Sequence, residues 1–192
     1  QHGHMAAVGY DLYCKMLGEA VKKEKGGMVE EHFDTTIDLD IDAYLPETYV
    51  ASEEQRLDLY KRIALIDSEE GRDEMLDELI DRFGEPSRSV QNLLFIAMLR
   101  MEAHKAFVTD IVQRPEEIVF TLFERAAIDA SGIPAVIEKN KPYVTFTADA
   151  KHPAFHYFYK KNSRIKPKDL PDLVMTFVKE LQGLALNQKS EN

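Results

Sequence analysis

Hydrophobic positions recur at helical spacing through the first half of the chain. A period of three to four residues is typical of helices that bury one face. The pattern predicts four such helices, over residues 6–24, from 52 to about 64, from 68 to 83, and from Ser87 or Ser89 to about Phe107. The last of them carries apolar residues on several faces, so we expect it to form the centre of the core.

Small polar residues and glycine mark the helix ends. Ser52 and Ser68 are of the type that caps helix N-termini, and Gly84 with Pro86 ends the helix that follows Ser68. Each of these two helices carries one apolar stripe that we expect to face the core. The stripes are Leu57, Tyr60, Ile63 and Ala64 in the first helix, and Leu76, Leu79, Ile80 and Phe83 in the second.

Strands are expected on both sides of this helical run. Residues Thr36–Ala43 alternate apolar side chains with aspartates, as in a strand with one wet face. The second half adds β-branched and aromatic runs at 108–112, 118–123, 143–147 and 155–159, a short helix at 133–140, and a last helix from about Asp169. This order predicts an α+β fold in which helices pack on a small mixed or antiparallel sheet, preceded by a separate N-terminal helix.

The chain is acidic and lacks the motifs of common enzyme classes. Its formal net charge is −10, which disfavours general binding to polyanions. It contains no phosphate-binding P-loop, no H-E-x-x-H and no paired C-x-x-C. The single Cys14, with no signal peptide and no apolar run of membrane length, predicts a cytoplasmic protein without membrane contact.

Two candidate metal sites fail on their spacing. The run Asp38–Asp42 resembles the start of a calcium loop, but Ala43 stands where that loop needs Gly, and Tyr49 stands where it needs Glu. His152 and His156 are four residues apart, but Pro153 between them opposes a shared helix face. We therefore expect no metal, no cofactor and no catalytic activity in this chain.

Charge is divided between two segments. Residues 67–85 hold nine acidic residues and two arginines, whereas residues 151–189 hold eight basic residues and three acidic ones. Both can be ordinary solvated surfaces. The basic segment also has rings beside cations, as a nucleic-acid-contacting module would, although alternate rings of a strand equally face a core. The run is Tyr157, Phe158, Tyr159, Lys160, Lys161, Arg164, Lys166 and Lys168.

Four short motifs occur in the order and spacing of a known family. They are Gly9–Tyr13, Ile41–Pro46, Gln55–Ala64 and Glu78–Gly84. Together with Gln1, Gly3 and His4, which look like the end of a translocation motif, they resemble the C-terminal part of the bacterial transcription-repair coupling factor. The resemblance is strong to about residue 105 and weaker beyond it. The chain begins with Gln1 and not with Met. This observation and the resemblance both suggest that the chain is part of a longer protein.

The resemblance implies that this chain and the rest of a longer protein carry different functions. The family's parent protein is a DNA translocase, driven by ATP with Mg²⁺, that removes stalled RNA polymerase and recruits the damage-recognition ATPase of excision repair. Residues 1–30 would be a helix and linker left from the translocase module, with Gly26-Gly27 ending the helix. Residues 31–192 would be the non-catalytic C-terminal regulatory domain. In the resting protein this domain packs against an N-terminal repair-helicase-like module and masks the surface that recruits the ATPase.

The resemblance also implies which residues make that contact. In the family they lie in the helix that ends Glu-Leu-Ile-Asp-Arg-Phe-Gly, and they correspond here to Glu78, Asp81 and Arg82. Their spacing of i, i+3 and i+4 forms one patch beside the apolar stripe. An ordinary intrahelical Glu78–Arg82 pair is the plain alternative. Opposite arginines of a partner, the same acids would form charge-assisted bonds.

Overall fold

The computed structural model describes residues 32–186. These residues fall into two compact units. The helical unit comprises residues 32–34 and 40–101, and the sheet unit comprises residues 35–39 and 102–186. The second boundary lies between residues 101 and 102, inside the helix that precedes the β-branched and aromatic run starting at Val108. The helix predicted over residues 6–24 lies outside the described residues.

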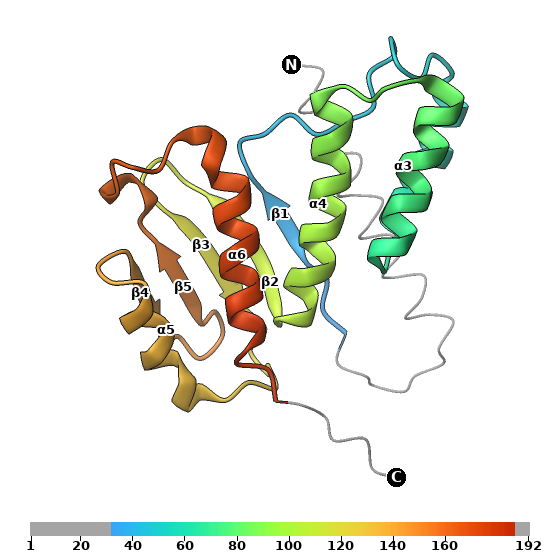
Figure 1. Cartoon of the computed structure of the whole chain (residues 1–192). Coiled ribbons are helices and arrows are strands. Elements are labelled where there is room, and N and C mark those ends of the chain that lie inside the picture. The colour runs from blue at the N-terminus through green and yellow to red at the C-terminus, as the bar shows by residue number, and fades with distance from the viewer. Residues whose placement is uncertain (1–31, 187–192) are drawn as a thin grey trace. The chain divides into compact units, whose positions relative to one another are not determined.

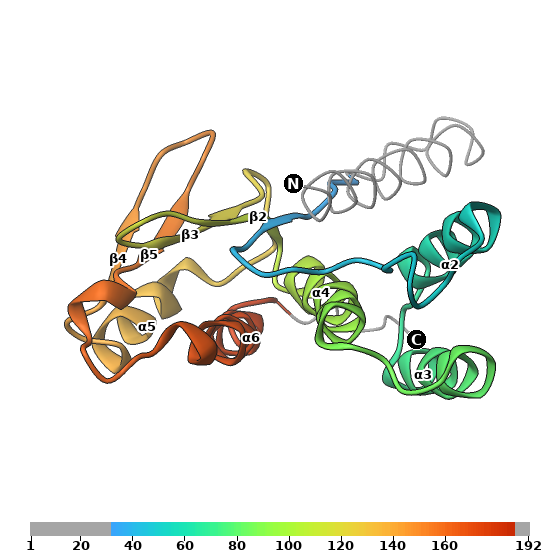
Figure 2. The same cartoon turned by 90° about the horizontal axis from the view of Figure 1, so that it is seen from above.

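The helical unit is built from α2 (Glu53–Ala64), α3 (Glu69–Phe83) and the larger part of α4 (Arg88–Lys105); Figure 1 labels α3 and α4, and Figure 2 also labels α2. Both predicted caps are confirmed. The Ser52 Oγ accepts a hydrogen bond from the Gln55 N–H at 3.2 Å, and the Ser68 Oγ accepts one from the Gly71 N–H at 3.0 Å. Gly84 ends α3 with a φ of 87°, a backbone conformation that favours glycine.

The apolar stripe of α2 is rotated from the predicted one. The helix buries Leu59, Tyr60 and Ile63, whereas Leu57 is 45% exposed. The prediction of a buried Leu57 was wrong for a geometric reason. At about 100° per residue, Leu57 lies about 120° around the helix from Ile63, whereas Leu59 lies only about 40° from it.

The stripe of α3 is also displaced. Met75 and Leu79 are buried, and Leu76, Ile80 and Phe83 are only half-buried. Sequence reasoning therefore missed Met75. In contrast, the prediction for the following helix is confirmed, because α4 buries apolar side chains on several faces. These include Val90, Leu93, Leu94, Ile96, Ala97, Met98 and Leu99.

A tyrosine joins the segment before α2 to the end of α3. The Tyr49 hydroxyl lies 2.8 Å from the Gly84 carbonyl oxygen and 3.1 Å from that of Leu79. Its ring packs on Phe83 with the centroids 5.7 Å apart. These contacts fix the C-terminal turn of α3, which carries the predicted contact residues.

The sheet unit contains five strands in the order β1-β2-β3-β5-β4. They are β1 (Thr36–Asp38), β2 (Val108–Gln113), β3 (Ile118–Leu122), β4 (Val144–Thr147) and β5 (Ala154–Tyr157). β1 runs parallel to β2, and every other neighbouring pair is antiparallel, so the sheet is mixed. The first strand is shorter than the predicted Thr36–Ala43, because only its first three residues pair with β2.

Two helices, α5 (Ile133–Lys139) and α6 (Leu170–Gln182), lie on one face of this sheet (Figure 2). Three short 3₁₀ turns complete the unit, η1 (Ala130–Gly132), η2 (Tyr159–Lys161) and η3 (Pro167–Asp169). The Phe177 ring of α6 lies 4.8 Å from Phe120 and 5.8 Å from Phe155, centroid to centroid. The α+β prediction is confirmed. None of the described helices is long and apolar enough to cross a membrane.

Candidate functional site

The three predicted contact residues lie on α3 but differ in their surroundings. Asp81 and Arg82 are exposed, whereas the Glu78 side chain is only 31% exposed. No described residue forms a hydrogen bond or ion pair with the Asp81 carboxylate. Further exposed acids precede it on the helix at Glu70, Asp73, Glu74 and Asp77. The structure therefore places the three residues on one helix but gives Glu78 a different environment.

Glu78 is bound by two arginines. Arg62, on α2, donates from Nη1 to Oε2 at 2.6 Å and from Nη2 to Oε1 at 2.5 Å. Arg82, one turn further along α3, donates from Nη1 to Oε2 at 3.0 Å. The Glu78–Arg82 bond is the intrahelical pair that the sequence offered as the plain alternative to a partner contact, and the bond from Arg62 was missed. Sixteen residues separate Arg62 from Glu78, and only the packing of α2 against α3 brings them together.

The electrostatic consequence is a strongly stabilised carboxylate. Hydrogen bonds from Arg62, and then from Arg82, lower the pKa of Glu78 from 4.5 to about 2. The same hydrogen bond raises the pKa of Arg62. Glu78 is therefore ionised in neutral solution, and each of its oxygens already accepts a short, charge-assisted bond within the helical unit.

Arg82 is held on two sides. Its Nη1 bonds Glu78, and its Cζ lies 4.9 Å from the centroid of the neighbouring Phe83 ring. A guanidinium over a ring face is an attractive cation–π arrangement. The 37% exposed Arg82 side chain is thus ordered before any partner arrives. The same turn presents this ordered cation beside the Asp81 carboxylate, which has no bonded partner within residues 32–186.

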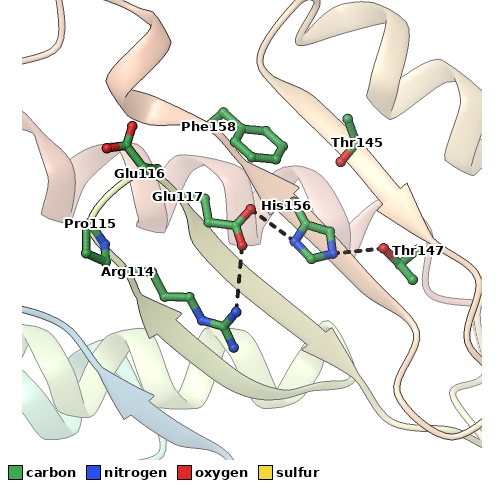
Figure 3. Close-up of a pocket in the computed structure, with 8 residues that line it drawn as sticks. All are labelled: Arg114, Pro115, Glu116, Glu117, Thr145, Thr147, His156 and Phe158. Atoms are coloured by element: carbon green, nitrogen blue, oxygen red, sulfur yellow. Dashed lines mark hydrogen bonds and ion pairs between the residues drawn. The ribbon is translucent and has the colours of Figure 1, made fainter.

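A second polar cluster lies in a hollow of the sheet unit (Figure 3). The hollow measures about 640 Å³ and is lined by Arg114, Pro115, Glu116, Glu117, Thr145, Thr147, His156 and Phe158. Phe155 and Tyr157 contact Phe177 of α6. Because side chains alternate along a strand, His156 between them points to the opposite face of the sheet.

His156 bonds to neighbours at both ring nitrogens. Its Nδ1 lies 3.2 Å from the Glu117 carboxylate, and its Nε2 lies 2.9 Å from the Thr147 hydroxyl (Figure 3). Arg114 approaches the same carboxylate less closely, at 3.8 Å. The hollow thus has a preformed polar floor, but its polar groups largely satisfy one another. Sequence reasoning considered His156 only as a partner of His152. Its pairing with Glu117 follows from the β3–β5 register, in which Val119 lies opposite His156. Glu117 stands two residues before Val119 and so lies on the same face of the sheet, diagonal to His156.

No metal-binding cluster occurs in residues 32–186. Nowhere in that range do three or more His, Cys, Asp or Glu side chains come close enough to hold an ion. His152 is exposed in the loop between β4 and β5.

The rings of the basic segment do not form an exposed row. Tyr159 is buried, and its hydroxyl donates to the Arg114 carbonyl at 2.6 Å. Tyr157 meets Phe177 edge-on at 5.3 Å. The Phe158 ring is nearly parallel to the His156 ring, with the centroids 6.3 Å apart, and the Lys161 ammonium lies 4.7 Å from the Phe158 centroid. These rings therefore serve the core and their own neighbours, whereas base stacking needs open ring faces.

The chain is similar in sequence and in fold to proteins of one family. Residues 39–133 match the TRCF domain. This chain belongs to the TRCF domain family. It is 38% identical over 133 residues to the transcription-repair-coupling factor of Bacillus subtilis, an alignment that covers 69% of the chain and 11% of that relative. It is 35% identical over 122 residues to the protein of the same name from Mycobacterium bovis, covering 58% of the chain and 10% of the relative.

The fold similarity concerns the same region of such a protein. A crystal structure of the C-terminal domain of transcription-repair coupling factor superimposes with a TM-score of 0.66 and 24% identity. The match covers 79% of this chain and 93% of that domain. This chain therefore has the fold of such a C-terminal domain, and it spans about a tenth of the length of the curated relatives.

Proposed function

We propose that this chain is a non-catalytic, autoinhibitory interaction domain of a transcription-repair coupling factor. In the resting protein, α3 packs against the N-terminal repair-helicase-like module and masks the surface that recruits the damage-recognition ATPase of excision repair. RNA polymerase and DNA are handled by other parts of that protein, which also bind ATP and Mg²⁺. The observation that carries the proposal is the exposed turn of α3, where Asp81 has no bonded partner among the described residues and Arg82 is held by Glu78.

The physical argument is preorganisation. A charged pair on a rigid helix end binds a complementary surface with little loss of side-chain freedom, and charge complementarity selects the partner. The acids that precede Asp81 on the same helix add a long-range attraction for a basic module. The basic segment supports nucleic-acid binding less well, because Tyr159 is buried and Tyr157 packs against Phe177, which leaves the half-buried Phe158 beside the hollow.

The test is binding between the full chain and the separately produced N-terminal module. Asp81→Lys should weaken binding at least tenfold, whereas the double change Lys160→Glu with Lys161→Glu should leave the Kd within twofold. DNA should not compete. Failure of the wild-type chain to bind, or an unchanged Kd for Asp81→Lys, would overturn the proposal. Salt-sensitive DNA binding that the lysine changes abolish would favour the nucleic-acid-contacting alternative.

A further inference from the structure

The bonds of Glu78 change the chemistry that α3 offers to a partner. Its two oxygens already accept three hydrogen bonds from Arg62 and Arg82. A partner arginine would have to displace one of these cations to reach the carboxylate. The cluster of one anion and two cations is locally positive, in contrast to the acidic residues around it.

We infer that Glu78 is a positioning residue and that the partner-facing groups of this turn are the guanidinium of Arg82 and the carboxylate of Asp81. The inference rests on the proposed function and deepens it. Arg62 anchors Glu78 from α2, Glu78 holds Arg82, and the Phe83 ring supports the guanidinium from its other side. The partner surface that fits this arrangement presents a carboxylate to Arg82 and a cation to Asp81.

The energetic reason is the freedom of the arginine side chain. A free arginine loses much rotamer entropy when it is fixed at an interface, and prior ordering removes part of that loss. Removing the anchor should therefore weaken binding by roughly 2- to 10-fold even though the anchor does not contact the partner.

Arg62→Met separates positioning from direct contact, because the two roles predict opposite signs. If Glu78 positions Arg82, the change loosens the cluster and weakens binding to the N-terminal module. If Glu78 itself binds a partner arginine, the change frees its carboxylate and tightens binding. Arg62→Lys, which keeps one cation, should give an intermediate Kd. Arg88→Met is the matched control, since it removes an exposed arginine outside the cluster.

The measurement is the Kd of each full-chain variant for the N-terminal module, with a thermal melt to confirm folding. Weaker binding by Arg62→Met, an intermediate Arg62→Lys and an unchanged Arg88→Met are expected. Tighter or unchanged binding by Arg62→Met, while Asp81→Lys still weakens it, would overturn the positioning role and leave the proposed function standing. An unchanged Asp81→Lys would overturn the proposed function itself. If Arg62→Met does not fold, the Kd of Arg62→Lys decides by the same signs.

Discussion

Glu78 in the helical unit and Glu117 in the sheet unit are both half-buried carboxylates, and each lies near nitrogen atoms of two other side chains. Glu78 binds two arginines at 2.5–3.0 Å. Glu117 lies 3.2 Å from His156 and 3.8 Å from Arg114. The difference lies in what else joins the elements. Backbone hydrogen bonds already connect β3 to β5, whereas helices share no backbone ladder and depend on side chains. The same residue type therefore contributes more between helices than on a sheet.

The comparison implies that apolar packing contributes more to the stability of the sheet unit than polar side-chain contacts such as Glu117–His156 do. Phe177 is buried against Phe120, Phe155 and Tyr157. Phe177→Ala should lower the free energy of unfolding of this unit by about 3–5 kcal/mol, because it removes a ring and leaves a cavity. Hydrogen exchange of the β3 and β5 amides measures this loss. A change below about 1 kcal/mol would show that the ring cluster is not the core.

Glu78→Gln should have the next largest effect. It removes the charge that joins α2 to α3, and we expect the helical unit to lose about 1–2 kcal/mol, since Arg62 and Arg82 are partly exposed and screened by solvent. Amide exchange in α3 reports the loss. The matched control is Glu74→Gln on the same helix, where the side chain is exposed. Equal effects of the two changes would contradict the special role of Glu78.

The stability of the helical unit should depend on acid in a defined range. The folded pKa of Glu78, about 2, lies below its ordinary value of 4.5. The stabilisation is therefore complete above pH 4.5 and is lost as the pH falls towards 2. Denaturant unfolding between these pH values should show a fall in wild type that Glu78→Gln lacks. A variant with the same pH profile as wild type would assign the acid sensitivity to other carboxylates.

Glu117→Gln should have the smallest effect. The ladder between β3 and β5 remains, so the sheet unit should lose no more than about 0.5 kcal/mol. Amide exchange at β5, compared with wild type at neutral pH, checks this. A loss equal to that of Glu78→Gln would remove the contrast between the two units.

The local pattern predicted most elements of the fold. The caps at Ser52 and Ser68, the strands β2 and β3, and the helix α6 all rest on neighbouring residues. The length of β1 was not predictable in this way, because its end depends on where pairing with the distant β2 stops.

For the site residues, too, the sequence indicated contacts between neighbours along the chain and missed contacts between distant elements. The Glu78–Arg82 pair lies within one helix, and its spacing allowed the sequence to offer it as the alternative to a partner contact. Arg62 and the Glu117–His156 pair required the three-dimensional arrangement, since 16 and 39 residues separate the partners. Spacing in the sequence carries no signal for contacts that depend on how helices and strands pack.

The most direct test of the account is the pKa of the Glu78 carboxyl group in the full chain. A carbon-detected NMR titration of glutamate side chains, with Glu78→Gln to assign the signal, measures it. A pKa near 2 is expected, because Arg62 and Arg82 both donate to the carboxylate. A pKa near the ordinary 4.5 would show that the carboxylate is free in solution. Glu78 would then be available to a partner arginine, which contradicts the positioning role.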